Sequence, residues 1–216
     1  MLCHNYIFFD SDPSIHTVSP AELKKQKTQF AEIIARHKNV KTEAYATLGL
    51  KAGTRFGLWM QADSVEEIQT ILAELMHTPL GAHLKITYTL FGLIRESQYS
   101  KKPPEETKAT ERRYLIVYPF TKTKEWHLIA FDERKNMMWD HVKVGKKFSA
   151  SIEQVLLYAY GVDDHEFIVS YQTDSLLDFQ TLVMELRATE GRRYTENDTP
   201  IFTCVRKSVS DALEMI

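Results

Sequence analysis

Cysteine is almost absent from this sequence, since Cys3 and Cys204 are the only two among 216 residues. Two cysteines cannot form the dense disulfide framework of a small secreted domain. The N-terminal segment also lacks the basic region and the long apolar stretch of a secretory leader, because its apolar run Tyr6–Phe9 covers only four residues. We therefore expect two reduced thiols in a cytoplasmic protein, with a disulfide that joins the two ends of the chain as the alternative.

The sequence has neither a long hydrophobic run nor an excess of one charge. No stretch approaches the roughly 20 apolar residues that a membrane span needs. Lys and Arg number 27 against 29 Asp and Glu, a net charge of −2, which does not favour nucleic acid or an anionic membrane as the main partner. The composition, with 44% apolar residues, is that of a globular protein able to bury roughly 70% of its unfolded surface.

The common short catalytic motifs are missing as well. The sequence has no Gly-rich phosphate loop, no Gly-x-Ser-x-Gly elbow and no His-Glu-x-x-His pair. Asp163–Glu166 contains four potential metal ligands in a row, but consecutive residues of an extended chain point to opposite faces and do not converge on one ion. We interpret this stretch, which follows Gly161, as a polar turn between two strands rather than a metal site.

A charged, proline-containing segment divides the chain. Residues 97–110 include the pair Pro103 and Pro104, blocks of opposite charge and no apolar period, which is typical of a linker or surface loop. We predict an N-terminal half at 1–96, a linker at 97–110 and a C-terminal half at 111–216.

The two halves resemble one another at an offset of 111 positions. Residues 61–75 and 172–186 share seven identical pairs among fifteen, and each copy has an Asp-Ser pair ahead of an amphipathic helix. Each half has the order strand–helix–strand–strand–helix–strand of the ferredoxin-like unit. In the C-terminal half we expect strands at 114–119, 155–160, 166–172 and 201–206 and helices at 132–148 and 176–186. The sequence thus predicts an α+β fold in which two ferredoxin-like halves form a dimeric α+β barrel within one chain. Chance similarity of two amphipathic helices is the alternative to duplication.

One of the eight histidines lies on an apolar helical stripe. Met137, His141, Val144 and Phe148 share a face by their i, i+4, i+7 and i+11 spacing, and we expect this face to contact the core. A single histidine in such a place is usually a hydrogen-bonded core residue. An imidazole in an apolar wall is also what an iron porphyrin requires as its axial ligand, so both interpretations stay open on this evidence.

Several segments of the C-terminal half point to one family. They are YLIVYPFTKTKEW (114–126), Glu133-Arg134, Met137-Met138-x-x-His141, the hairpin 161–167, residues 186–194 and residues 198–203. In order and spacing they resemble the chlorite dismutase family of haem proteins, which includes the coproheme decarboxylases. The resemblance covers residues 111–206 and implies a barrel of two halves, haem b or coproheme as the iron-containing cofactor, and assembly as a homopentamer.

The resemblance implies a role for each matching residue around the haem. His141 stands at the position of the proximal iron ligand, and Glu190 matches the glutamate that accepts a hydrogen bond from the other ring nitrogen and so fixes the tautomer. Lys122 matches a lysine that meets a haem propionate, and Trp126 matches an aromatic residue beside the haem. Outside the family context, these would be an exposed carboxylate, a solvated lysine and a core tryptophan.

The residue on the opposite, distal face decides which chemistry the resemblance implies. It lies thirteen positions after the proximal histidine and is Gln154 here, where the chlorite-degrading members carry an arginine. A guanidinium can hold the chlorite and hypochlorite anions, and a neutral amide holds them far less well. A glutamine resembles the branch that decarboxylates coproheme oxidatively, whose radical-forming tyrosine matches Tyr118. A packed strand aromatic is the alternative for Tyr118.

Two features depart from the decarboxylase pattern. Only three residues separate Lys122 from Trp126, the spacing of the chlorite-degrading members, and Gly191-Arg192-Arg193 stands where the decarboxylases have a serine-containing stretch that helps to hold a propionate. We expect a haem-dependent oxidoreductase that converts coproheme to haem b with hydrogen peroxide or another small oxidant. The alternatives are chlorite dismutase-like or weak peroxidase activity, haem binding without turnover, and a member that has lost haem binding.

Overall fold

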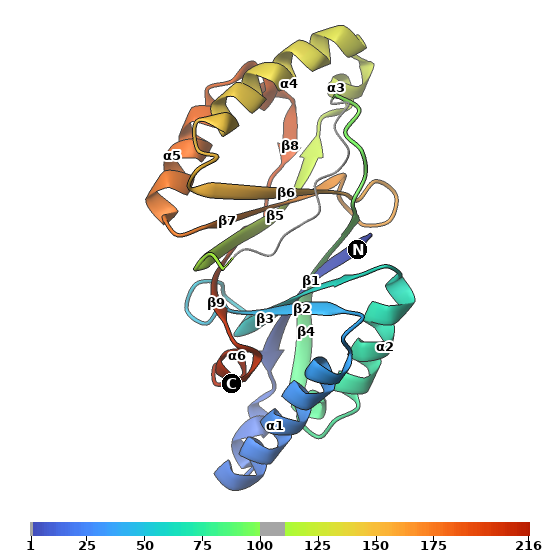
Figure 1. The fold of residues 1–216 in the computed structure, drawn as a ribbon, viewed down its shortest axis with the longest axis vertical. Coiled ribbons are helices and arrows are strands. Elements are labelled where there is room, and N and C mark those ends of the chain that lie inside the picture. Colours follow the sequence, from blue (N-terminus) through green and yellow to red (C-terminus); the bar gives the residue numbers. More distant parts are fainter. Residues whose placement is uncertain (1, 100–110) are drawn as a thin grey trace. The chain divides into compact units, whose positions relative to one another are not determined.

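The structure is a computed structural model that describes residues 2–99 and 111–216. The chain forms two compact units (Figure 1). The first contains the chain up to Leu93 together with Phe202–Ile216, and the second contains Ile94–Ile201. Of the predicted linker, residues 100–110 lie outside the described residues, and 97–99 belong to the second unit.

The first unit has the element order of a ferredoxin-like half. In chain order its elements are β1 (Cys3–Ser11), η1 (Pro13–Thr17), α1 (Pro20–Arg36), β2 (Lys41–Ala46), β3 (Phe56–Ala62), α2 (Val65–Met76), η2 (Gly81–His83) and β4 (Leu84–Leu93), joined by β9 (Phe202–Lys207) and α6 (Val209–Leu213) from the end of the chain. The first four strands lie in the order β4-β1-β3-β2 and pair antiparallel. This is the sheet order of a split βαβ unit.

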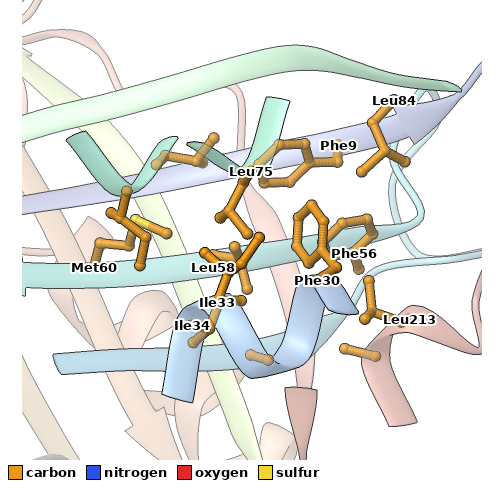
Figure 2. Packing of buried hydrophobic residues seen from close by; sticks show 14 of the residues in the cluster. Phe9, Phe30, Ile33, Ile34, Phe56, Leu58, Met60, Leu75, Leu84 and Leu213 are labelled. Carbon is orange, nitrogen blue, oxygen red and sulfur yellow. The ribbon is translucent and has the colours of Figure 1, made fainter. Parts of the chain in front are cut away.

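The core of the first unit lies between its helices and its sheet. Phe30 and Ile33 of α1 pack with Leu75 of α2 and with Phe9 and Phe56 of the sheet, and all five are buried (Figure 2). The rings of Phe9 and Phe56 stack with their centroids 4.8 Å apart. Burial of each large apolar side chain contributes about 1.5–3 kcal/mol to folding, so this layer holds the helices on the sheet.

The second unit repeats the arrangement with two additional short elements. In chain order it contains β5 (Tyr114–Lys122), α3 (Lys124–Leu128), α4 (Phe131–Lys146), β6 (Ile152–Tyr158), β7 (Phe167–Thr173), α5 (Leu176–Arg187), η3 (Glu190–Tyr194) and β8 (Thr195–Asn197). Its strands lie in the order β6-β7-β5-β8, again antiparallel. Buried residues of β6, β7 and α5 form its core, with side chains of α4 packed against them.

The internal duplication extends to the register of the strands. Ile7 of β1 lies opposite Leu58 of β3, and Tyr118 of β5 lies opposite Val169 of β7. Both members of the second pair are displaced by 111 positions from the first, the offset found in the sequence. The predicted fold class, α+β with two ferredoxin-like halves, is confirmed.

The last strand does not follow the expected boundary between the halves. The strand predicted at 201–206 is β9, and it pairs antiparallel with β2, where Arg206 lies opposite Tyr45. Phe202 stacks on Phe8 with the ring centroids 3.9 Å apart, an aromatic contact that favours this pairing. Residues from 202 onward therefore belong to the first unit, and the three-residue β8 takes the fourth place in the second sheet.

Both cysteines are buried in the first unit as free thiols rather than joined in the alternative disulfide. Burial raises the pKa of Cys204 far above its usual value, so that thiol stays protonated. No helix within the described residues is long and apolar enough to cross a membrane.

Candidate active site

Gln154 and Tyr118 lie on the same face of the second sheet. In the register of β6 and β7, Gln154 lies opposite Tyr171, and in that of β5 and β7, Tyr118 lies opposite Val169. Directly opposed residues share a face, and so do residues two apart on one strand. Tyr118, Val169 and Tyr171 belong to a cluster with residues of α4 and α5, so this face is the one that the helices cover.

α4 directs its apolar stripe toward the same face. Met137 is buried, and Val144 and Phe148 pack against the cluster that includes Tyr118. His141 lies between them on the stripe and is half-buried. The helical face predicted from the sequence is thus the face that contacts the sheet, and it presents His141 toward the side that carries Gln154.

The His141 imidazole is neutral at physiological pH. Burial, with a contribution from the positive charge of Lys122, lowers its pKa to about 4. Within the described residues the ring makes no hydrogen bond to the protein. A neutral imidazole whose lone pair is not engaged is the form of histidine that binds a metal.

In the first unit, the corresponding layer between helix and sheet is fully packed. α1 and α4 begin 111 positions apart, so Phe30 of α1 corresponds to His141 of α4. Phe30 is fully buried in the first core, whereas His141 is half-buried. On the helix-facing side of β6, Leu156 remains 37% exposed. The second unit therefore leaves part of its helix–sheet layer accessible where the first unit is packed.

These features fit an iron porphyrin, the cofactor that the sequence resemblance implies. His141 would supply a neutral imidazole ligand to the iron, and the accessible apolar layer would provide a wall for the flat macrocycle. Carboxylate side chains of a porphyrin require cations, and Lys122 lies close enough to His141 to influence its pKa. His141, Lys122 and the neighbouring Trp126 are the residues that would hold such a group.

Lys122, at the end of β5, and Trp126, in α3, form a cation–π pair. Lys122 Nζ lies 4.2 Å from the centroid of the Trp126 ring and donates a hydrogen bond to the Gly191 carbonyl oxygen at 3.0 Å. Both side chains are buried. Burial lowers the pKa of Lys122 to about 8, with the charge of Glu166 opposing this effect and that of Arg192 adding to it. The structure thus brings two of the predicted cofactor-binding residues together.

Glu166 connects the end of β5 to α3. Its Oε2 accepts a hydrogen bond from the backbone N–H of Lys122 at 2.8 Å, and its Oε1 lies 2.7 Å from His127 Nε2. The acidic stretch that contains Glu166 follows Gly161, whose φ of +71° suits a turn. Within the described ranges no group of three or more His, Cys, Asp or Glu residues could hold a metal ion. Through the contacts with the Lys122 N–H and His127, Glu166 links the end of β5 to α3.

Glu190 does not make the hydrogen bond to His141 that the resemblance implies. η3, which begins at Glu190, packs against α4. The carboxylate is nevertheless exposed and forms an ion pair with Arg193, with 3.3 Å between Glu190 Oε1 and Arg193 Nη1. The structure places Glu190 on a segment that contacts the helix of His141, but its side chain points to a different partner.

A charged cluster that the sequence analysis did not identify lies near Tyr118. Arg192 Nη1 lies 2.6 Å from Asp198 Oδ2, and Arg187 Nη2 lies 3.6 Å from the same oxygen. Burial raises the pKa of Tyr118 to about 12, and the charges of Asp198, Arg187 and Arg192 also act on it. Arg192 influences the pKa of Lys122 too, as Glu166 does, so three cations gather on this side with the carboxylates of Asp198 and Glu166. Their sequence spacing gave no signal of this grouping.

Tyr171 is a second residue that the sequence analysis did not identify. It is buried, and its ring lies beside that of Tyr118 with the two centroids 6.2 Å apart. A buried tyrosine in a strand carries no local sign of function, because aromatic residues are common in strands.

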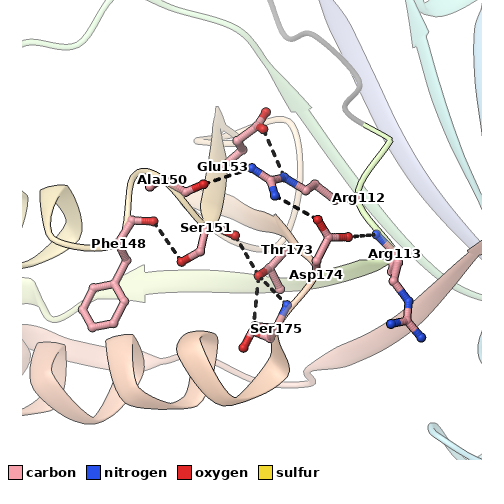
Figure 3. Close-up of polar contacts among 9 residues, drawn as sticks. All are labelled: Arg112, Arg113, Phe148, Ala150, Ser151, Glu153, Thr173, Asp174 and Ser175. Carbon is pink, nitrogen blue, oxygen red and sulfur yellow. Dashed lines mark hydrogen bonds and ion pairs between the residues drawn. The ribbon is translucent and has the colours of Figure 1, made fainter.

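The start of β6 is held by a polar network around Arg112 (Figure 3). Arg112 Nη1 donates a hydrogen bond to Asp174 Oδ2 at 2.8 Å, and Nη2 donates one to the Ala150 carbonyl oxygen at 3.1 Å. Its Nε lies 3.4 Å from Glu153 Oε1. Because Glu153 directly precedes Gln154, this network fixes the place of Gln154 on the sheet.

The fold and these residues define an α+β protein of two ferredoxin-like halves with a candidate histidine-centred cofactor site in the second. The family model for chlorite dismutase matches residues 22–207. The chain belongs to the chlorite dismutase family.

Relatives and solved structures agree with this assignment. The chain is 28% identical over 210 residues to a coproheme decarboxylase of Mycolicibacterium smegmatis. The aligned residues cover 93% of this chain and 90% of the relative. It also resembles a mutant chlorite dismutase from Candidatus Nitrospira defluvii with a TM-score of 0.92 and chlorite dismutase from the same organism in complex with imidazole with a TM-score of 0.91. Both structures are 22% identical to this chain, and each comparison covers 99% of this chain and 94% of the other. At that identity they show the fold.

Proposed function

We propose that this protein binds an iron porphyrin through His141 and oxidatively decarboxylates coproheme to haem b with hydrogen peroxide. The observation that carries the proposal is the position of Tyr118. It lies on the same helix-facing side of the sheet as the neutral Gln154, beside a cluster of cations. The similarity to a coproheme decarboxylase of M. smegmatis supports the same activity.

The cations suit a substrate with many carboxylates. Coproheme carries four propionates, whereas haem b carries two. The three cations Lys122, Arg187 and Arg192 outnumber the two carboxylates near them, those of Asp198 and Glu166. Arginine forms paired, charge-assisted hydrogen bonds with a carboxylate, so these side chains would bind propionates and orient the porphyrin beside Tyr118.

The reaction balances as one propionate, one hydrogen peroxide and one proton giving one vinyl group, one carbon dioxide and two waters. When bound, the iron porphyrin would supply the redox chemistry that lets peroxide act as the oxidant. Tyr118 would give up a hydrogen atom from its phenol and then take one from the propionate side chain. The protein's contribution is to hold the phenol and the substrate in this geometry.

The test is to treat the coproheme-loaded protein with hydrogen peroxide and to determine the products by mass. We expect the stepwise loss of two carboxyl groups, and we expect Tyr118→Phe to bind coproheme without that loss. Products formed equally well by Tyr118→Phe would remove Tyr118 from the mechanism. Bleaching of bound coproheme without decarboxylation would overturn the proposed activity.

A chlorite dismutase-like or weak peroxidase activity is the second candidate. The three-residue spacing between Lys122 and Trp126 favours it, and the neutral side chain of Gln154 opposes it. Bleaching in the peroxide experiment, together with rapid oxygen release from chlorite, would select this candidate. Bleaching with neither product would leave haem binding without turnover.

A further inference from the structure

Arg134 of α4 is a half-buried arginine that has no polar partner among the described residues. Its Nε atom is buried and makes no hydrogen bond, and its guanidinium forms no ion pair within that part of the chain. Its charge contacts the ring of Phe131, whose centroid lies 5.8 Å from Arg134 Cζ. Phe131 is itself exposed, so this contact is weak. Unpaired donors in a buried place are unfavourable.

α4 itself offers no counter-charge to Arg134. Residues three and four positions away on a helix lie beside one another, whereas residues one and two positions away do not. Asp132 and Glu133 are one and two positions away, and both are exposed. The four neighbours at three and four positions are all apolar. They are Ala130, Phe131, Met137 and Met138.

The carboxylate of Glu166 acts on the same surroundings but is already engaged. Burial raises the pKa of Tyr160, the charge of Glu166 adds to this rise, and that of Arg134 opposes it. Both charges therefore lie near this phenol. Glu166 accepts a hydrogen bond from the Lys122 N–H with one oxygen, and its other oxygen lies 2.7 Å from His127 Nε2. Glu166 thus does not serve as the counter-ion of Arg134.

The first unit has a leucine at the equivalent place. At the offset of 111, Arg134 corresponds to Leu23 of α1, just as His141 corresponds to Phe30. Leu23 packs against the buried core of its unit. The layer between helix and sheet therefore accepts an apolar side chain at this position, and an arginine there gains nothing from packing. Its charge points to a ligand that the cofactor-free protein lacks.

Arg134 and His141 share one stripe of α4, because they are seven residues apart. Two helical turns separate them by roughly 10 Å along the axis. A porphyrin carries its carboxylates at its edge, so a porphyrin centred on His141 would bring its edge within reach of a long, flexible arginine side chain. A guanidinium matches a carboxylate with paired, charge-assisted hydrogen bonds.

We propose that Arg134 binds a propionate of the porphyrin at a position separate from the cluster around Lys122, and that this propionate is one that the reaction leaves unchanged. The proposal rests on the proposed function in that the ligand is the porphyrin of His141. The pKa of Lys122 responds to Glu166 and Arg192 and not to Arg134. Arg134 therefore lies apart from the cations beside Tyr118, and its carboxylate lies apart from the reacting ones.

The first test measures affinity for coproporphyrin without iron by fluorescence titration. This probe keeps the four propionates but cannot bind a histidine through iron, so the titration reports on the carboxylate contacts. Arg134→Leu should weaken binding roughly 10- to 150-fold, the effect of losing hydrogen bonds to a charged group. Arg134→Gln, which keeps a polar side chain, should weaken it similarly and replaces the leucine variant if that variant does not fold. Unchanged affinity would overturn the proposal.

The tetramethyl ester of coproporphyrin shows whether the carboxylate is what Arg134 binds. The ester has the same ring and no negative charge, so Arg134→Leu should bind it as the wild type does. An equal loss of affinity for the acid and the ester would show that Arg134 shapes the site without binding a carboxylate, which would overturn the proposal.

Arg113→Leu is the matched control for these titrations. Arg113 is exposed, its Cζ lies 5.3 Å from the centroid of the Tyr114 ring, and its side chain points away from the polar network in Figure 3. The substitution removes the same charge and the same kind of ring contact from the same unit. It should leave the affinity for coproporphyrin unchanged. A loss equal to that of Arg134→Leu would attribute the effect to net charge and overturn the proposal.

The stability and assembly of the cofactor-free protein provide a second measurement. Arg134→Leu should raise the Tm by about 2–4 °C, because the variant has the leucine found in the first unit and no unpaired guanidinium. A lower Tm would show that Arg134 has a partner in the free protein. A lower assembly mass in light scattering would assign that partner to a second copy of the chain. Either result would overturn the proposal.

The peroxide reaction separates this proposal from the proposed function. If the wild type only bleaches coproheme, the proposed function falls, while weaker binding of the acid and unchanged binding of the ester by Arg134→Leu still support the propionate contact. If the wild type decarboxylates coproheme and Arg134→Leu binds it with unchanged affinity, the function stands and the role of Arg134 is overturned.

Discussion

Lys122 Nζ lies 4.2 Å above the centre of the Trp126 ring, and both side chains are buried. A charged lysine in this place is unfavourable for folding, because its pKa falls from an ordinary 10.5 to about 8. That shift corresponds to roughly 3 kcal/mol. The hydrogen bond to Gly191 and the contact with Trp126 offset about 2 kcal/mol of it. Lys122→Met should therefore raise the free energy of unfolding of the cofactor-free protein by about 1 kcal/mol at pH 7 and weaken coproheme binding.

The stability difference between Lys122→Met and the wild type should depend on pH in a defined direction. Between pH 8 and 10.5 the unfolded chain binds more protons at Lys122 than the folded protein does, so the wild type gains stability as the pH rises through this window. Lys122→Met lacks this gain, and its advantage should disappear by about pH 10.5. Urea unfolding at several pH values measures the stability advantage of Lys122→Met. Lys124→Met, at an exposed position, is the control. A Lys122→Met protein that is less stable than the wild type at pH 7 would contradict the predicted gain in stability. Unaltered coproheme binding in this variant would contradict the predicted role of Lys122 in binding.

His141→Ala should abolish the Soret absorption of the protein supplied with haem while the fold remains intact. The imidazole is half-buried and neutral, so its removal exposes no unpaired charge and should change the free energy of unfolding by about 1 kcal/mol or less. Absorption spectra and circular dichroism of the same sample separate the two effects. His16→Ala, at an exposed position in the first unit, is the control. An unchanged Soret band in His141→Ala would show that another residue binds the iron.

Local signals in the sequence were sufficient to predict most elements of the fold. The Asp-Ser pairs predicted the starts of two helices, and in the structure Ser64 accepts a hydrogen bond from the backbone N–H of Glu67, as Ser175 does from that of Asp178. The predicted strand 166–172 differs from β7 by one residue at each end, and the predicted helix 176–186 ends one residue before α5 does. Capping and periodicity depend on residues close together in the chain, so one sequence is enough to identify them.

Features that depend on distant partners could not be predicted in this way. Nothing within β9 indicates that it pairs with β2 or that Phe202 stacks on Phe8, because alternation in a strand shows its faces and not its neighbour. Gln154 was expected just before a strand and lies inside β6. The contact between the rings of Tyr118 and Tyr171 joins two neighbouring strands and becomes visible only once the register of β5 and β7 is known.

Substitution of Glu190 should have different effects on the cofactor-free and the haem-bound protein. Its carboxylate is 54% exposed and paired with Arg193, and exposed pairs contribute about 1 kcal/mol or less. Glu190→Gln should therefore leave the stability of the cofactor-free protein almost unchanged. If Glu190 accepts a hydrogen bond from His141 when haem is bound, the variant should lower the iron–histidine stretching frequency, because the imidazole becomes less basic. Resonance Raman spectra of the ferrous protein measure it.

Arg193→Gln is the matched control for Glu190, since it breaks the same ion pair and keeps the carboxylate. It should leave the iron–histidine frequency at the wild-type value. If Glu190→Gln and Arg193→Gln give the same frequency as the wild type, Glu190 has no role behind the ligand and serves only as the surface partner of Arg193.

We expect Gln154 to make chlorite a poor substrate. Its amide is exposed on the helix-facing side of β6, and it offers a neutral hydrogen bond where a guanidinium would offer a charge-assisted one. The difference amounts to about 1.5–3 kcal/mol, or roughly 10- to 150-fold in rate or affinity. Gln154→Arg should increase oxygen release from chlorite by that factor, and because the position is exposed, the added charge carries little desolvation cost.

An oxygen electrode measures the rate, and Gln180→Arg, exposed on α5, controls for the added net charge. An equal increase in both variants would attribute the effect to overall charge, and fast chlorite turnover by the wild type would show that an arginine is not needed at this position.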